Sequence, residues 1–557
     1  MNKNQYLISK FQILSIVCSS CSAFALWKVL RSCIQSAISA RLFTKVFKLS
    51  AWAQGTIFIT GAIILVLALD WWFEIFCEPP IPGLPQIPGW PIVGNLFQQG
   101  PSAAMTYWSW RYEVFQLRLG TKRVVVANSF NSIYNLWQVN WKTNISRPTL
   151  YTFHQIISKS QGTTIGTTPY SETWRRMKKV VAANLSTSSI QSYAPILNSN
   201  SSHCISCLKK VVGKDIDVHP ILEISTLCIS LELNYGISFE PDHPIFKEIV
   251  TVEKEINRAR SPIHNSQDYL PILRVWPFRK AQNHGMEELR ARRDQYMNHL
   301  LALLKNDIKN CKKSPCISGN ILVNTTKSAG AITKSELRSI CLTMVSAGLD
   351  TIPSNIVACI GHLGHPVYGK SIQVKAFNAI QKCYPDGDAW DRCITDTKYV
   401  PYMMILIKET LRFTTSQPIS LPRETYGGSI IYNQTTMIPP GTMLLMNTLA
   451  GNFDSRRYKD PFQFNPERFC PESEEIKLQK YTLDHLGFGA GSRMCAGYKL
   501  ATKELYVMLV RLILTFKILP PKDISLPILE IDVTKRFSKV DNMVVDSNQF
   551  FVCLEPR

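Results

Sequence analysis

The chain has 557 residues, of which 45% are hydrophobic and 18% charged, so it carries enough apolar side chains for a large folded core. Glycine (27) and proline (32) are near average usage, which excludes a collagen-like or largely disordered chain. Lysine and arginine exceed aspartate and glutamate by 21, but there is no zinc-finger spacing and no long basic run, so nucleic acid is not an expected partner. The 16 cysteines lack framework spacing, which excludes a disulfide scaffold.

The N-terminal part of the chain predicts a membrane anchor. Residues 1–50 form a basic extension with a possible first hydrophobic segment at 11–27. Residues 51–69 contain no charge, and a helix of that length spans about 28 Å, close to the hydrocarbon core of a bilayer. Trp71, Trp72 and Phe73 follow as an interfacial belt, so we expect a transmembrane anchor at 51–77. The alternative is a buried core helix.

The orientation of this anchor stays open. The positive-inside rule would hold the basic residues of 28–48 in the cytosol, and a single span after them would place the main domain in the lumen.

After the anchor, the sequence predicts a stiff connector and then one large body. Six prolines in residues 78–95 favour extended chain and exclude a helix. No similar linker follows, so residues 96–557 read as one catalytic domain. We expect this body to be mainly α with a small β region: a hairpin at 114–129, helices at 287–310, 333–361, 401–413 and 496–516, and short strands near 428–432 and 443–446.

The strongest chemical signal is the segment FGAGSRMCAG at 488–497. Gly491 permits a turn that residues with a Cβ disfavour, and Gly497 lets the following helix approach a ligand closely. Cys495 stands just before that helix, where backbone N–H groups favour a thiolate.

Phe488, Gly491, Arg493, Cys495 and Gly497 match F-x-x-G-x-R-x-C-x-G, so the chain resembles the cytochrome P450 superfamily over residues 78–557. The resemblance implies a cytochrome P450 fold behind the N-terminal membrane segment. It also implies haem b as cofactor, with Cys495 as the axial ligand of the iron. Phe488 would belong to the haem-binding loop, and Arg493 would pair with a haem propionate.

Two further segments resemble family motifs. Glu409 and Arg412 stand three apart on a helix, and Arg468 in NPERF is available to complete a buried Glu-Arg-Arg network. SAGLDT at 346–351 resembles the oxygen-activation motif, in which Thr351 would hold the water that delivers protons and Asp350 would relay protons from solvent.

Other cofactor-binding positions follow from the same resemblance. Trp174 begins WRRMK, which matches a W-x-x-x-R propionate clamp except that Lys178 replaces the arginine, and lysine keeps the charge but loses the planar fork. Arg423 in LPRET occupies a position where the family often has another propionate contact.

The connector, the segment 150–167 and SAGLDTIPSN are similar to fungal members of the phenylacetate-hydroxylase type. In the family, 150–167 corresponds to the main substrate-recognition loop, with residues 417–421 as another wall. Pocket candidates are Leu150, Tyr151, Phe153 and Ile156, for each of which ordinary packing is the equal alternative.

The expected function is that of a haem-thiolate monooxygenase that oxidises a small apolar or aromatic substrate with O₂ and electrons from an NADPH-dependent reductase docked on its basic face. The expected setting is the endoplasmic reticulum membrane, with a cytosolic catalytic domain and a role in fungal secondary-metabolite biosynthesis. Breakdown of aromatic acids by a phenylacetate-type hydroxylase is the alternative. A non-oxidative haem-thiolate isomerase or a haem sensor is the alternative of another class.

Overall fold

The structure of the protein is a computed structural model that describes residues 51–75, 77–97, 107–160, 163–240, 242–260, 264–275, 279–310, 316–325, 332–473, 482–533, 535 and 544–557. The predictions made for residues 1–50 lie outside this part of the chain. The chain divides into two compact units, residues 1–75 and 76–557, which are described separately.

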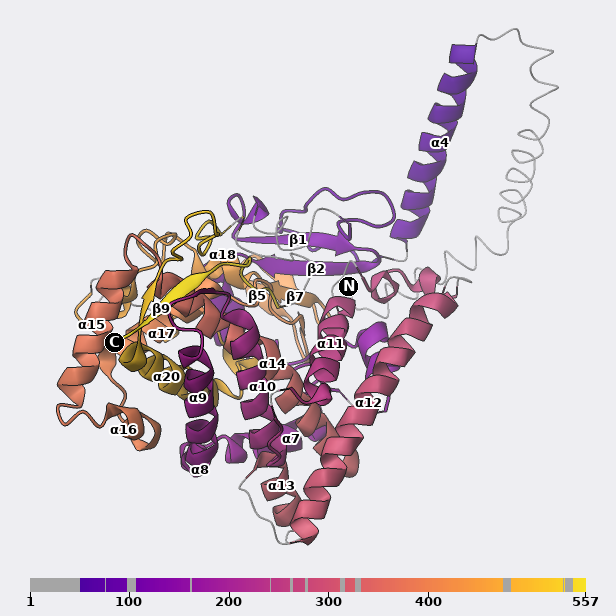
Figure 1. Ribbon diagram of the computed structural model, residues 1–557. Helices are drawn as coiled ribbons and strands as arrows, with labels where there is room; N and C mark the ends of the chain where they lie inside the picture. Colours follow the sequence, from indigo (N-terminus) through magenta and orange to yellow (C-terminus); the bar gives the residue numbers. More distant parts are fainter. Residues whose placement is uncertain are drawn as a thin grey trace. The chain divides into compact units, whose positions relative to one another are not determined.

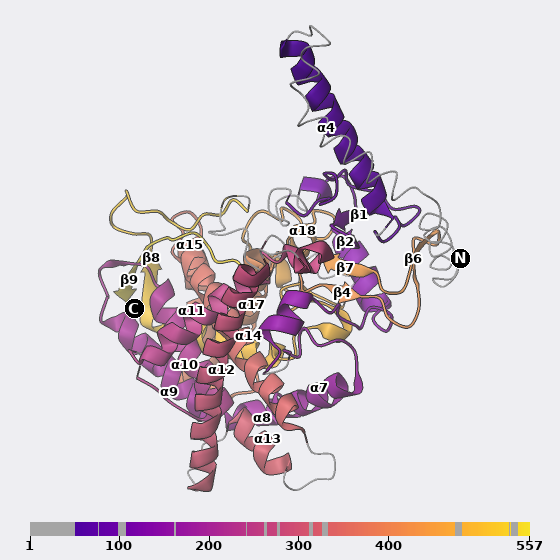
Figure 2. The same cartoon turned by 90° about the vertical axis from the view of Figure 1, so that its right-hand side faces the viewer.

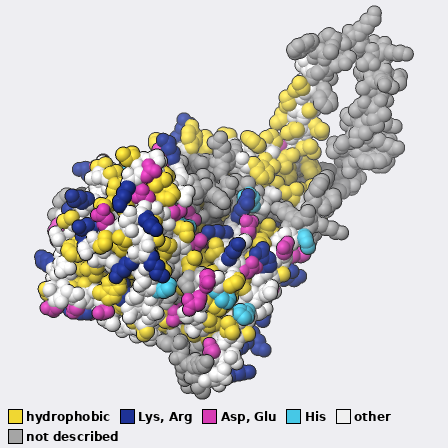
Figure 3. Space-filling model, viewed as in Figure 1, with side chains coloured by type: hydrophobic (Ala, Val, Ile, Leu, Met, Phe, Trp, Pro, Cys, Tyr) yellow, Lys and Arg dark blue, Asp and Glu magenta, His cyan; other side chains and the backbone are white. Residues whose placement is uncertain are grey.

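In the first unit, the uncharged segment forms one helix, α4 (Ala51–Glu74), of 24 residues. Its apolar side chains are largely exposed, between 42% at Val66 and 74% at Trp71 (Figure 3). Several side chains of α4 lie outside the described part of the structure. Among helices whose side chains are described throughout, α14 (Lys334–Leu363) is long and apolar enough to cross a membrane. However, 61% of its apolar window is buried, as in the core helix of a folded domain.

The second unit is mainly helical, as predicted, and α14 runs through its interior (Figures 1 and 2). A capping box between Thr333 and Glu336 begins this helix, and it packs against α7, α10, α17 and α20. The other helices whose bounds lie within the described residues of the unit are α6 (Phe130–Ile133), α7 (Glu172–Asn184), α8 (Thr187–Ser192), α9 (Ala194–Lys209), α10 (His219–Tyr235), α11 (Pro244–Ala259), α12 (Arg279–Lys309), α13 (Ile317–Thr325), α15 (Gly369–Cys383), α16 (Ala389–Thr395), α17 (Pro401–Thr414), α18 (Thr448–Asn452) and α20 (Tyr498–Thr515).

Short helical turns connect these helices. Two of them are π-helical, η1 (Tyr134–Val139) and η2 (Tyr151–Ile157). Four are 3₁₀ turns: η3 (Ser266–Asp268), η4 (Pro271–Arg274), η5 (Pro466–Phe469) and η6 (Gly491–Arg493).

The four-stranded sheet lies at one side of the helical part, and strands β8 (Phe516–Leu519) and β9 (Val552–Pro556) lie apart from it (Figure 2). The predicted hairpin is formed by β1 (Val114–Leu119) and β2 (Lys122–Ala127), which pair antiparallel. Strand β2 pairs parallel with β7 (Met443–Met446), and β7 pairs with β4 (Arg423–Glu424), giving the order β1-β2-β7-β4. The remaining strands are β3 (Asp215–Ile216), β5 (Ile430–Tyr432) and β6 (Thr436–Ile438).

A buried charge network joins the helical core to the segment that precedes the cysteine loop. Glu409 and Arg412 are both 0% exposed and form a two-pronged pair at 2.7 and 2.8 Å, and Arg468 Nε reaches Glu409 Oε1 at 3.2 Å. The backbone N–H of Asn465 also donates to Glu409 Oε1. The predicted Glu-Arg-Arg network is confirmed, and removing one member would leave buried charge uncompensated at a cost of about 3–5 kcal/mol.

Candidate active site

The loop around Cys495 is held by backbone geometry that only some residues adopt. Gly489 and Gly491 have φ of 73° and 65°, and a Cβ at Gly491 would overlap the carbonyl oxygen of Trp137. The N–H of Cys495 donates to Phe488 O at 2.9 Å and closes the loop just before α20. A Cβ at Gly497 would lie in van der Waals contact with Cys495 Sγ, at 3.9 Å, so Gly497 directly neighbours the sulfur.

The surroundings of Cys495 combine access with desolvation. The side chain is exposed, yet the surrounding protein raises the pKa of the thiol, while the backbone N–H of Gly497 opposes this shift. Because Cys495 is surrounded by protein atoms and still has accessible surface, its side chain lies at the wall of an internal space. Ala347 on α14 is likewise exposed, although the C-terminal half of that helix is buried.

The predicted propionate contacts gather beside this loop. Lys178 Nζ donates to Ser492 O at 2.8 Å, and the Arg493 guanidinium lies 3.8 Å from the centroid of the Trp174 ring. Arg423 donates to Ala490 O within the loop itself. The structure therefore brings Trp174 and Lys178 to a loop that lies more than 300 positions later in the sequence, and it places Arg423 and Arg493 beside them.

These cations repel one another. Desolvation, together with Arg493 and Arg423, lowers the pKa of Lys178, and desolvation with Arg147 and Arg493 lowers that of Arg423. Desolvation and Arg147 lower the pKa of Arg493 to about 8, and Arg147 itself falls to about 9 through burial and Arg260. Among the described residues, no aspartate or glutamate forms an ion pair with any of these four.

The cluster fits the carboxylates of a haem. Trp174 Nε1 and Arg493 Nη2 are buried without a hydrogen-bond partner in the described structure, so two donors remain for an anion. A cationic cluster, donors of this kind and a thiol on one loop form the donor set that a porphyrin with propionates and an iron requires.

On α14, the side chains of the SAGLDT segment have distinct surroundings. Thr351 is half-buried, and its Oγ1 donates to Ala347 O at 2.9 Å. Asp350 Oδ2 accepts from Asn257 Nδ2 at 2.6 Å. Desolvation, followed by repulsion from Asp546, raises the pKa of Asp350 to about 7, with Lys254 opposing the shift. A carboxyl that titrates near neutrality is suited to proton transfer.

The predicted substrate loop contains η2. Phe153 and Ile156 are buried, whereas Leu150 and Tyr151 are half-buried. A Cβ at Gly166 would lie 3.4 Å from Leu421 Cδ1, so the loop and the 417–421 wall lie side by side.

Sequence reasoning missed Arg147, Asn257 and Arg260, which contact or repel members of the site. They carry no local motif, and no signal in the sequence distinguishes them from ordinary helix and loop residues.

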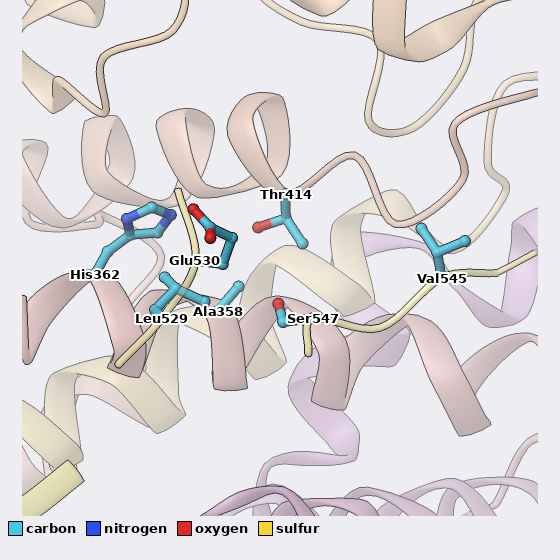
Figure 4. A pocket seen from close by; sticks show the side chains of 7 residues that line it. All are labelled: Ala358, His362, Thr414, Leu529, Glu530, Val545 and Ser547. Carbon is cyan, nitrogen blue, oxygen red and sulfur yellow. The ribbon is translucent and has the colours of Figure 1, made fainter. Parts of the chain in front are cut away.

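A separate small cavity lies farther along α14 (Figure 4). It has room for about one water molecule, which excludes it as a site for an organic substrate. His362 stacks on Phe464 with ring centroids 3.8 Å apart, so one wall of the cavity is rigid. Its lining residues are Ala358, His362, Thr414, Leu529, Glu530, Val545 and Ser547.

Comparison with known proteins agrees with this fold. A family model described as cytochrome P450 matches residues 82–537. Phenylacetate 2-hydroxylase of Emericella nidulans is 42% identical over 470 residues, 83% of this chain and 88% of that protein. 3-Hydroxyphenylacetate 6-hydroxylase of the same organism is 36% identical over 80% of this chain and 84% of that protein.

Solved structures share the fold. A zebrafish cytochrome P450 with abiraterone superimposes with a TM-score of 0.65 at 21% identity, covering 82% of this chain and 99% of that one. A second zebrafish structure, with progesterone, gives 0.64 at 18% identity, with the same coverage of both chains.

The fold and the cysteine loop define a haem-thiolate oxidoreductase. The chain belongs to the cytochrome P450 family. Its cofactor is accordingly a haem with a thiolate-ligated iron, and monooxygenases of this family act on small molecules with O₂ and a redox partner.

Proposed function

We propose that the protein hydroxylates an aromatic carboxylic acid, using O₂ and electrons from an NADPH-dependent reductase. The observation that carries the oxygenase chemistry is the cysteine loop beside a cationic cluster that fits the haem propionates. The activities of the two Emericella relatives, on phenylacetate and 3-hydroxyphenylacetate, support an aromatic acid as the substrate. We propose breakdown of such acids, rather than secondary-metabolite biosynthesis, as the role of the protein.

In this proposal, Cys495 would supply the thiolate that holds the haem iron, and Trp174, Lys178, Arg423 and Arg493 would hold the propionates. Arg493 is stacked on Trp174 and fixed by Ile145 O at 2.7 Å, so its remaining donor is pre-oriented. Lys178 acts as a point charge, where arginine would form a planar fork.

Phe488 accepts the N–H of Cys495 at its carbonyl and packs beside His485 and Tyr498, so it fixes the start of the loop.

When bound, the haem supplies the activation of dioxygen. Two side chains of α14 transfer protons in this proposal. Thr351 holds at Oγ1 the water that donates a proton, and Asp350 exchanges a proton with solvent near neutral pH. Asn257 orients the Asp350 carboxyl through its 2.6 Å hydrogen bond. This pairing supports an oxygenase over a haem-thiolate isomerase or a haem sensor, which would use no proton relay.

The test is turnover of the full chain with a cytochrome P450 reductase, NADPH, O₂ and phenylacetate. We expect a hydroxylated product whose oxygen derives from ¹⁸O₂, formed in proportion to the NADPH consumed. Product formed without O₂ would indicate an isomerase, and binding without NADPH consumption would indicate a sensor.

We also propose that residues 51–77 anchor a domain of residues 96–557 to the endoplasmic reticulum through the connector 78–95, with residues 1–50 as an N-terminal extension and the domain in the cytosol. The exposed apolar side chains of α4 support this arrangement. The body is expected to fold by itself, since its buried core lies within residues 76–557.

Removing residues 1–77 is expected to release the protein from membranes without loss of haem. The measurement is the fraction that pellets with membranes after a high-salt wash, with the carbon monoxide difference spectrum as the control for folding. A truncated protein that still pellets fully would place the anchor elsewhere.

A further inference from the structure

The last turn of α11 meets two parts of the active site. Asn257 donates to Asp350 on α14, which brings this turn against the oxygen-activation segment. Arg260, three residues later, is the C-cap residue of α11, and its guanidinium carbon lies 4.5 Å from the centroid of the Phe153 ring in η2. Residues three apart on a helix are offset by about 4.5 Å along its axis, so a cation stands one turn from the Asn257–Asp350 contact.

Arg260 has no anionic partner in the described structure. Neither an ion pair nor a side-chain hydrogen bond of its guanidinium is found there. Glu253 is the acidic residue whose charge raises the pKa of Arg260. Its carboxylate, however, already accepts hydrogen bonds from Tyr296 and Ser346, each at 2.6 Å, and lies 3.9 Å from Arg293. Residues 261–263, which follow in the sequence, are Ser, Pro and Ile and carry no carboxylate.

The other charged neighbours of Arg260 are basic. Its charge acts on Arg147 and His154, and Arg293 acts on Arg260. Desolvation is the main cause that lowers its pKa to about 10, yet the side chain keeps accessible surface, the combination also found at Cys495. A desolvated cation among cations is costly unless an anion meets it.

We propose that Arg260 is a specificity-determining residue that binds the carboxylate of the aromatic acid substrate. A guanidinium presents two parallel N–H donors that match a carboxylate, and the Phe153 ring holds its plane in place. With the carboxylate at Arg260, the aromatic ring extends toward α14, where Asp350 and Thr351 lie. This inference rests on the proposed function and names the group by which the substrate is recognised.

The carboxylate that meets Arg260 has a second source, because haem propionates are also carboxylates. The experiment therefore compares phenylacetate with phenylacetamide, its neutral amide, by the change in the haem absorption spectrum on titration, in the full-length holoenzyme. For Arg260→Gln, we expect phenylacetate to bind about 10-fold to 100-fold more weakly, with phenylacetamide and haem content unchanged. Arg260→Lys should recover part of the loss.

The matched control is Arg258→Gln, which removes an exposed arginine from the same turn and should leave both affinities unchanged. Equal weakening of acid and amide, or no weakening of the acid, would overturn the inference. Loss of haem from Arg260→Gln would assign the arginine to a propionate and also overturn it.

Different outcomes overturn the proposed function and the role of Arg260. If the wild type prefers acid to amide and Arg260→Gln abolishes that preference, yet no product forms with NADPH and O₂, the hydroxylase proposal is wrong and Arg260 still binds the acid. If the wild type binds neither probe but oxidises neutral aromatic compounds, the monooxygenase stands and the role of Arg260 is overturned.

Discussion

Replacing Cys495 by alanine is expected to abolish the red-shifted Soret band that the reduced protein gives with carbon monoxide. The loop places this sulfur next to Gly497 and near a cluster of cations that fits the haem propionates. A thiolate is the ligand that gives the band, and alanine offers no donor in its place. Activity should fall to background, since no other side chain reaches the same position on the loop.

The matched control is Cys383→Ala, which removes an exposed thiol at the end of α15 and should leave the band intact. Haem content measured in both variants separates loss of the ligand from loss of the cofactor. A persistent band in Cys495→Ala would assign the axial ligand to another cysteine.

The elements that the sequence predicted are those specified by nearby residues. The hairpin 114–129 follows from β-branched residues around a turn, and the structure pairs Leu119 with Lys122 across it. The helix expected at 333–361 corresponds to α14, because Thr333 and Glu336 form a capping box that marks its start.

Boundaries were less predictable than the elements themselves. The helix expected at 287–310 begins earlier, since α12 spans Arg279–Lys309. The helix expected at 496–516 begins at Tyr498, because the cysteine loop continues through Gly497.

The candidate site also has residues that the sequence predicts and residues that it does not. Cys495, Glu409 and Thr351 stand in short motifs, so their positions were visible in the sequence. Asn257 and Arg260 enter the site only because α11 packs near α14, with 93 positions between Asn257 and Asp350. Long-range packing of this kind has no periodicity or local motif, and only the folded chain brings these side chains together.

Thr351→Ala is expected to keep the thiolate spectrum but to divert electrons from product to hydrogen peroxide. Its hydroxyl stands in the half-buried stretch of α14 beside Asp350, whose pKa of about 7 suits proton exchange with solvent. Loss of one positioned proton donor typically lowers a rate by about 10²-fold to 10⁴-fold. Because Cys495 and the cationic cluster remain, haem binding should not change.

The measurement is product formed per NADPH consumed at saturating substrate, with hydrogen peroxide quantified in parallel. Thr351→Ser restores a hydroxyl at the same position and should recover most of the coupling, whereas a purely packing role would be kept better by Thr351→Val, which is nearly isosteric. If Thr351→Val couples as well as the wild type, the hydroxyl carries no proton, and the route must run from Asp350 through other groups.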